Sequence, residues 1–210
     1  NVEQWPTPEG TQRTSPPPSS TYGFQKLATE YYAQGAWEQY RLPFTIIRPF
    51  NCVGIGERRA LSDKEILSGN VKLAMSHVVP DLIQKVLKGQ NPLHILGDGS
   101  QVRHYTYGGD LAHGIRVCME HPKALNEDFN ISTATSTTVL ELAELIWNKI
   151  NPDAPFQFVS DEPFAYDVQR RVPDVQKAQT LLGFEATTSL SEVLDIVIPW
   201  VREQLEKGLI

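Results

Sequence analysis

A short apolar run at residues 44–47, with the sequence Phe-Thr-Ile-Ile, most constrains what this chain can fold into. Pro43 precedes the run and stops the helical pattern before it, because proline cannot continue a helix. Apolar and β-branched residues without polar alternation are typical of a strand buried on both faces, as in a parallel sheet. The run therefore predicts an α/β architecture. Asn51 follows this strand, where open α/β sheets bind their ligands.

The rest of the chain alternates between helical and strand-like patterns, which indicates an α/β arrangement followed by a small mixed lobe. Asp110 is expected to be a helix N-cap rather than an acid, and Pro199 is expected to kink or interrupt the last helix. The expected helices begin at Ser19 or Ser20, at Val78, near Asp110, at Thr137 or Thr138, near Asp174 and at Ser189, and further strands are expected at residues 94–96, 102–107 and 129–131.

Charge and cysteine content exclude several classes of protein. The formal net charge is -6, without a basic stripe, which argues against nucleic-acid binding. No run approaches the roughly 20 apolar residues of a membrane-spanning helix. Cys52 and Cys118 have neither metal-ligand spacing nor the density of a disulfide scaffold. Each is therefore expected to be a small buried apolar residue, in a cytoplasmic protein without a metal site.

Tyr22 and Lys26 are four residues apart at the start of the first predicted helix. Residues at this spacing lie on one face of a helix, so the phenol and the ammonium group can point at the same small volume. A nearby cation and the amino end of a helix both favour the phenolate, which makes the phenol a better base. Chance explains such a pair equally well, so the context decides.

Ordered motifs follow this pair along nearly the whole chain. Residues 45–54 read Thr-Ile-Ile-Arg-Pro-Phe-Asn-Cys-Val-Gly, and residues 96–107 read Leu-Gly-Asp-Gly-Ser-Gln-Val-Arg-His-Tyr-Thr-Tyr. Together with residues 18–26, 79–83, 129–131 and 173–184, they resemble the C-terminal part of the extended short-chain dehydrogenase/reductase family. Within that family the resemblance is to the NAD-dependent nucleotide-sugar epimerases and dehydratases.

The resemblance implies a fold and a domain organisation. The expected fold is the C-terminal part of a Rossmann-type doubly wound parallel sheet plus a small mixed α/β substrate-binding lobe. Residues 1–56 would belong to the NAD-binding Rossmann domain. Residues 57–210 would form mainly the nucleotide-sugar lobe, with segments near 101–135 returning to the Rossmann domain. The implied cofactor is NAD, with NADP as the alternative, and the implied assembly is a homodimer.

The resemblance also assigns roles to four residues. Tyr22 would be the acid/base that takes a proton from a sugar hydroxyl, while Lys26 would bind the nicotinamide ribose. Asn51 and Arg103 would contact the diphosphate of the sugar nucleotide, and a guanidinium group suits phosphate oxygens through its planar fork of donors. The alternatives are a turn-forming side chain for Asn51 and a surface salt bridge for Arg103.

Three further positions are weaker candidates for the substrate site. The backbone of Val78 would line the nucleotide pocket, and the strand that ends at Leu96 would lie against the base. Asp167 would help to fix the ribose or diphosphate through Arg170 or Arg171. By contrast, His94 and His104 are expected to be structural or exposed rather than catalytic.

Two parts that the family needs are not found in these residues. The Gly-rich turn that holds the cofactor pyrophosphate does not occur after a strand, and Gly54-x-Gly56 is in the wrong place. The catalytic Ser or Thr of the family would lie upstream of Asn1. The first half of the Rossmann domain is therefore expected to precede this chain, and the fragment alone is expected to be inactive.

Reaction type is left open among three hypotheses. The first is a C4 epimerase that acts through a transient 4-keto sugar. The second is a 4,6-dehydratase, a 3,5-epimerase or another sugar-nucleotide modifying enzyme of the same family. The third is a catalytically silent relative that binds a sugar nucleotide or NAD(P). Decarboxylases of the family tend to carry an arginine shortly after the Asn-x-x-Gly turn, where this chain has residues 55–57, Ile-Gly-Glu, ahead of Arg58 and Arg59.

Overall fold

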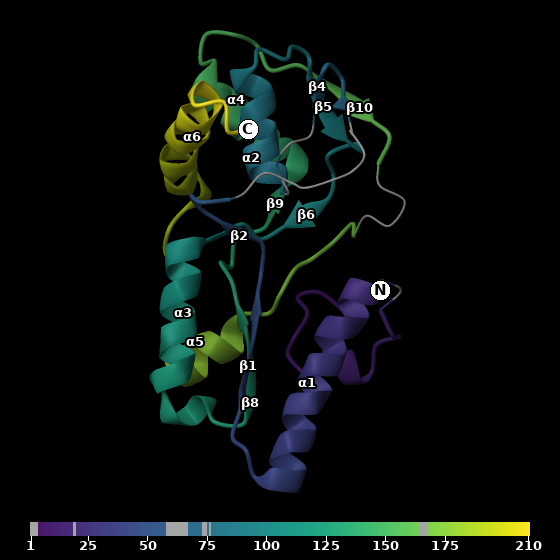
Figure 1. Cartoon of the computed structure of the whole chain (residues 1–210), viewed down its shortest axis with the longest axis vertical. Coiled ribbons are helices and arrows are strands. Elements are labelled where there is room, and N and C mark those ends of the chain that lie inside the picture. The colour runs from purple at the N-terminus through teal and green to yellow at the C-terminus, as the bar shows by residue number, and fades with distance from the viewer. Residues whose placement is uncertain (1–3, 19, 58–66, 73–74, 76, 164–167) are drawn as a thin grey trace. The chain divides into compact units, whose positions relative to one another are not determined.

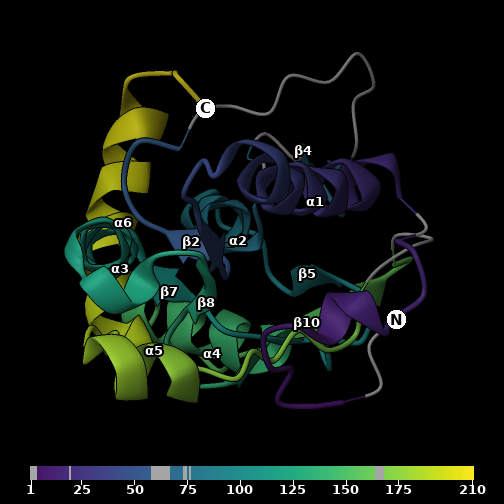
Figure 2. The same ribbon diagram turned by 90° about the horizontal axis from the view of Figure 1, so that it is seen from below.

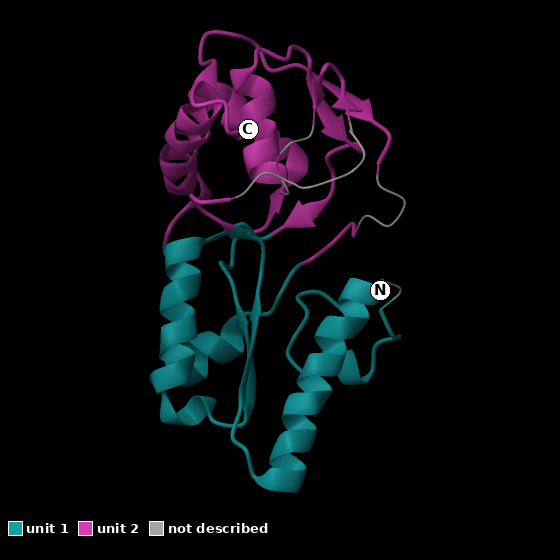
Figure 3. Ribbon diagram, in the orientation of Figure 1, with its two compact units in different colours: residues 1–52, 104–135, 172–187 teal, residues 53–103, 136–171, 188–210 magenta. Residues whose placement is uncertain are grey.

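The computed structural model describes residues 4–18, 20–57, 67–72, 75, 77–163 and 168–210. Helices and parallel strand pairs alternate in it, so the α/β prediction is confirmed. The chain divides into two compact units, shown in Figure 3. Unit 1 comprises residues 1–52, 104–135 and 172–187, and unit 2 comprises residues 53–103, 136–171 and 188–210. Each unit is thus assembled from three separate stretches of the sequence.

Unit 1 is built on the parallel pair of strands β1 (Thr45–Pro49) and β8 (Glu127–Ile131). Helices α3 (Gly108–Glu120) and α5 (Gln176–Leu182) lie on one side of this pair, and α1 (Thr21–Tyr40) lies on the other (Figures 1 and 2). The unit also contains the short 3-10 helices η1 (Thr11–Arg13) and η2 (Pro122–Ala124).

The core of unit 1 lies between β8 and the helices α3 and α5. Phe129 and Ile131 of β8 are fully buried there, against Leu111, Cys118 and Phe184. By contrast, β1 is only half-buried along the run that was expected to be covered on both faces. The buried core of the unit lies on the side of α3 and α5, and no residue of α1, all of which is described, is buried.

Gly114 of α3 permits this close packing, and replacing it with Ala tests the core. A Cβ at Gly114 would lie 2.6 Å from Cγ2 of Ile131 and 2.9 Å from Cε2 of Phe184. Because the core must shift to accept it, we expect Gly114→Ala to lower the free energy of unfolding in urea by about 1–3 kcal/mol. Gly35→Ala in α1 is the control, since nothing lies within 4 Å of its Cβ position. An equal effect of the two substitutions would contradict this account.

Unit 2 surrounds helix α2 (Val78–Leu87), which packs against α4 (Val139–Ile150), α6 (Leu190–Glu206) and strand β5 (Leu93–Leu96). Strand β5 is parallel to β10 (Phe158–Asp161). Two antiparallel pairs complete the unit, β3 (Leu67–Ser68) with β4 (Val71–Lys72) and β6 (Val102–Arg103) with β9 (Thr137–Thr138).

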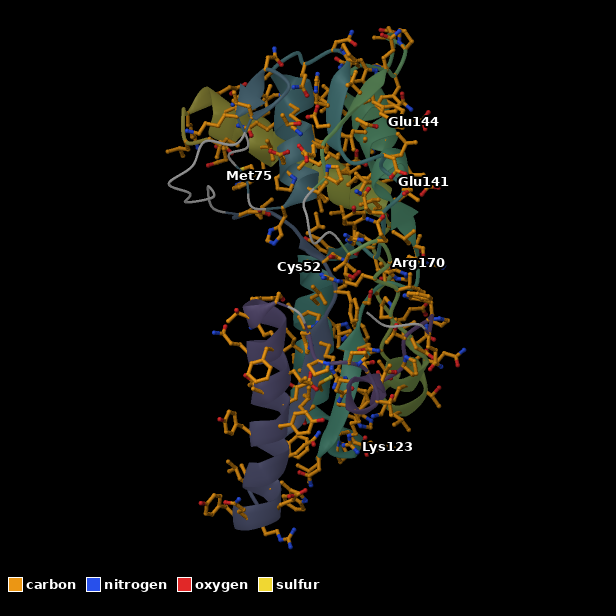
Figure 4. The ribbon with its side chains drawn as sticks, turned by 90° about the vertical axis from the view of Figure 1, so that its right-hand side faces the viewer. Cys52, Met75, Lys123, Glu141, Glu144 and Arg170 are labelled. Carbon is orange, nitrogen blue, oxygen red and sulfur yellow. The ribbon has the colours of Figure 1, made fainter. Side chains whose placement is uncertain are left out.

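Capping residues set the starts of α4 and α6 as the sequence predicts. Thr138 forms a capping box with Glu141, which is labelled in Figure 4, and Ser189 forms another with Glu192. The prediction for Pro199 is wrong where it expects an interruption, because α6 runs through that residue. The buried side chains Val193, Val197 and Val201 hold one face of α6 against the unit and keep the helix continuous.

Three other local predictions are corrected. The expected strand 102–107 is split into β6 and β7 (Thr106–Tyr107), which pair with β9 and β2 (Cys52–Val53) respectively. Asp110 is not an N-cap, because α3 starts at Gly108 with Tyr107 as its cap and carries Asp110 in its first turn. Its carboxylate still lies at the amino end of the helix, where negative charge is favoured. Cys118 is buried as expected, but Cys52 is exposed.

Candidate functional site

The start of α1 presents the first predicted site residues. Ser20 is the N-cap, with extended backbone angles, and its Oγ accepts a hydrogen bond from the backbone N–H of Gly23 at 3.1 Å. This confirms the predicted start of the helix, while Ser19 lies outside the described residues. Tyr22 is therefore in the first turn, where the helix dipole favours a developing negative charge.

Tyr22 and Lys26 lie together on one face of α1. The Lys26 ammonium group lies over the Tyr22 ring, 5.5 Å from its centroid, in a cation–π arrangement. Tyr22 is 71% exposed and Lys26 is also exposed, so ligand groups can reach both. The pair thus offers a proton-exchanging phenol and a cation to the same ligand.

Asn51 connects β1 to β2 in an unusual backbone conformation. Its φ is 37°, in the left-handed region that few residues other than glycine adopt, although Asn tolerates it better than most. Its Nδ2 donates to the carbonyl of His104 at 3.2 Å, and its own carbonyl accepts from the N–H of Thr106 at 3.1 Å. These bonds favour the turn-forming role, and the diphosphate contact stays a prediction.

Neither His94 nor His104 is arranged as a catalytic base. His104 is 2% exposed, and its Nδ1 donates to the carbonyl of Thr133 at 2.8 Å. Burial lowers the pKa of His104 and outweighs the opposing effect of this hydrogen bond, so the ring stays neutral near pH 7. His94 Nδ1 donates to Oδ1 of Asp161 at 2.8 Å, which joins β5 to β10. Both arrangements are structural.

The remaining predicted residues lie in unit 2. Val78 is the first residue of α2 and Leu96 the last of β5, and both are half-buried. Nη1 of Arg103 donates to the carbonyls of Val102 and Gln169, at 2.9 and 3.5 Å. The backbone of residues 169–171 runs beside β6, which places Arg170, labelled in Figure 4, near this strand. Asp167 lies outside the described residues, and its role stays a prediction.

Sequence reasoning missed an ion pair between Glu30 of α1 and Arg48 of β1. Glu30 of α1 accepts two hydrogen bonds from Arg48 of β1, from Nε at 2.7 Å and from Nη2 at 2.6 Å. The signal was available, because Glu30 follows Lys26 by four residues and therefore continues the same helical stripe.

The described part of the chain contains neither a candidate membrane-spanning helix nor a candidate metal-binding cluster. No helix there combines the length and apolar character needed to cross a bilayer. No group of at least three His, Cys, Asp or Glu side chains among the described residues is placed to hold a metal ion.

Comparison with known proteins reveals a family match and curated relatives. The profile of the NAD dependent epimerase/dehydratase family matches residues 1–132. A putative UDP-glucose 4-epimerase from Methanocaldococcus jannaschii is 31% identical over 88% of this chain and 54% of its own length. UDP-glucuronic acid decarboxylase 1 from Arabidopsis thaliana is also 31% identical, over 86% of this chain and 36% of its own length.

A solved structure of an epimerase is also similar to this chain. The crystal structure of UDP-glucose 4-epimerase from Thermotoga maritima with UDP-glucose is 32% identical to this chain. It superposes with a TM-score of 0.77 and covers 98% of this chain and 60% of its own. The chain spans about half the length of the curated epimerase relatives that it matches.

Proposed function

The chain belongs to the NAD-dependent epimerase/dehydratase family, and from this we propose that the whole protein is an NAD-dependent nucleotide-sugar C4 epimerase. Its fold is of the Rossmann type found in its structural neighbours. Unit 1, which carries Tyr22 and Lys26, would contribute to the NAD-binding domain. Unit 2 would supply most of the nucleotide-sugar lobe.

The observation that carries this proposal is the exposed Tyr22–Lys26 pair in the first turns of α1. A proton acceptor and a cation are held on one helical face, 5.5 Å apart from ammonium nitrogen to ring centroid, and neither is sealed in a core. A silent binding relative would have no need for a reachable phenol at this place. The names of the relatives support epimerisation at C4 in particular.

Each residue of the pair has a distinct task in this proposal. NAD, when bound, supplies the hydride acceptor and donor for the sugar carbon. Tyr22 accepts the proton of the sugar hydroxyl and returns it after the keto sugar has turned in the site. Lys26 binds the nicotinamide ribose and places a positive charge over the Tyr22 ring. The exposure of both side chains fits a cofactor that approaches α1 from outside.

The nucleotide sugar would be held by five residues that were predicted from the sequence. Asn51 and Arg103 would contact the diphosphate, Val78 and Leu96 would line the nucleotide pocket, and Asp167 would help to fix the ribose or diphosphate. The sequence has two cysteines, Cys52 and Cys118, too few for a disulfide scaffold, and from this we propose that the whole protein acts in the cytoplasm. We also propose that it is a homodimer, as the family resemblance implies.

Decarboxylation is the second candidate, because decarboxylases are among the relatives. The residue that follows the turn at Gly54–Gly56 is Glu57, and its Oε1 accepts a hydrogen bond from Nδ1 of His77 at 2.9 Å. Decarboxylases of the family tend to carry an arginine shortly after this turn, and Glu57 offers no positive charge to pair with the carboxylate of a uronic acid. This favours epimerisation of a neutral sugar over decarboxylation.

Incubation of the whole protein with NAD and UDP-glucose tests the proposal, with the products followed by NMR. We expect an equilibrium mixture of UDP-glucose and its C4 epimer. A 4-keto-6-deoxy product would instead identify a dehydratase. A parallel incubation with UDP-glucuronic acid that yields a UDP-pentose and carbon dioxide, without a C4 epimer of either nucleotide sugar, would identify a decarboxylase. Binding without any turnover would identify a silent relative.

A further inference from the structure

A charged side chain links α1 to the sheet of unit 1. The Glu30 carboxylate and the Arg48 guanidinium group meet through two parallel hydrogen bonds, at 2.6 and 2.7 Å. Both side chains are largely shielded from water, with exposed fractions of 16% and 20%. Paired bonds of this kind fix orientation as well as distance, because the guanidinium fork is planar and rigid.

Little else in the described residues holds the helix to the strands. None of the residues of α1, all of them described, is buried. The aromatic side chains Tyr22, Phe24, Tyr31, Tyr32 and Tyr40 are each more than half exposed, and Leu27 and Trp37 are half-buried. The other hydrogen bonds of its described side chains stay within or next to the helix, as that of Thr29 to Gln25 does. The Glu30–Arg48 pair is therefore the main polar connection between α1 and β1.

Glu30 also lies on the side of α1 that carries the proposed catalytic pair. Tyr22, Lys26 and Glu30 follow one another at intervals of four residues, so they form one stripe along the helix. If α1 rotated or slid relative to Arg48, the Tyr22 hydroxyl would move together with the helix. We infer that Glu30 is a positioning residue that sets the place of Tyr22 and Lys26 through Arg48, an inference that rests on the proposed function.

Arg48 is itself fixed from its other side. Its Nη2 also lies 2.9 Å from Oδ2 of Asp128 on β8, and Oδ1 of Asp128 accepts from Lys177 of α5 at 2.8 Å. Burial alone would raise the pKa of Asp128, but the bonds from Lys177 and Arg48 outweigh it and lower the pKa. Asp128 thus stays ionised near neutral pH. Ion pairs therefore link α1 to β1, β1 to β8 and β8 to α5, with negative and positive side chains alternating along the network.

Hydrogen exchange of the whole protein tests the mechanical part of this inference without any substrate. In Glu30→Gln the amide keeps the shape of the side chain but loses the charge, so we expect residues 21–40 to exchange about tenfold faster. Strands β1 and β8 should be unchanged. Glu203→Gln is the matched control, since it removes the same charge from an exposed ion pair with Lys207 at the end of α6 and should leave the exchange of α1 unaltered. Equal exchange of α1 in Glu30→Gln and wild type would overturn the inference.

Kinetics test the positioning part. We expect Glu30→Gln to lower kcat about tenfold with KM within about twofold, since misplaced reacting groups lose rate rather than ground-state binding. Arg48→Lys should fall between wild type and Glu30→Gln, because it keeps the charge but not the fork. An unchanged kcat in Glu30→Gln would overturn the inference even if the variant melts at a lower temperature. If wild type shows no turnover of any nucleotide sugar, the proposed function fails, and the exchange experiment still decides whether Glu30 holds α1.

Discussion

Replacing Tyr22 with Phe is expected to lower the turnover of a nucleotide sugar by about 10²–10⁴-fold, the usual contribution of a positioned acid/base. The substitution removes only the hydroxyl, so the ring remains beneath the Lys26 ammonium group. Because Tyr22 is 71% exposed, no packing in the described structure depends on that oxygen. The dissociation constant of the nucleotide sugar should therefore stay within about twofold, and steady-state rates with equilibrium binding measure both.

Tyr32→Phe is a matched control for this prediction. Tyr32 lies on the same helix and is 80% exposed, but it is not on the stripe that Tyr22 shares with Lys26. The Tyr32→Phe variant should turn over the nucleotide sugar at the wild-type rate. Equal turnover by Tyr22→Phe and wild type would reject the assignment of Tyr22 as the acid/base.

Replacing Arg103 with Ala is expected to weaken nucleotide-sugar binding by about 1.5–3 kcal/mol, which is a rise of roughly 10- to 150-fold in the dissociation constant. The reason is the loss of charge-assisted hydrogen bonds to the diphosphate oxygens. In the structure, Nη1 of Arg103 is turned to the backbone carbonyls of Val102 and Gln169, which would orient the planar group for a ligand. Isothermal titration with UDP-glucose measures the change.

Two controls separate this effect from a general loss of positive charge. Arg202→Ala removes an exposed arginine from α6, in the same unit, and should leave the affinity unchanged. Arg103→Lys should recover part of the affinity, because lysine keeps the charge but presents no fork. An Arg103→Ala protein that binds as tightly as wild type would show that Arg103 has no diphosphate role.

Local sequence signals predicted those parts of the fold that local forces decide. Ser20, Thr138 and Ser189 cap helices where the sequence indicates, because each satisfies free amide groups within its own turn. Gly183 ends α5 with a positive φ of 66°, as expected of a glycine after a helix. The Tyr22–Lys26 contact belongs to the same class, since four-residue spacing on one helix is enough to produce it.

Features that depend on distant parts of the chain could not be predicted in this way. The split of the expected strand at His104 arises because its carbonyl accepts from Asn51, a residue far away in the sequence. Pro199 stays within α6 because neighbouring apolar side chains are buried in unit 2. The Glu30–Arg48 pair likewise joins a helix to a strand. Contacts of this kind are set by tertiary packing rather than by pattern.

The most direct test of the central claim follows the hydrogen at C4 of the sugar. UDP-glucose deuterated at C4 is incubated in ordinary water with NAD and the whole protein, and the C4 epimer is isolated and examined by NMR. If the carbon gives hydride to bound NAD and takes it back on the opposite face, the deuterium stays at C4 of the epimer. An epimer that carries hydrogen from the solvent at C4, or an absence of the epimer, would contradict the account.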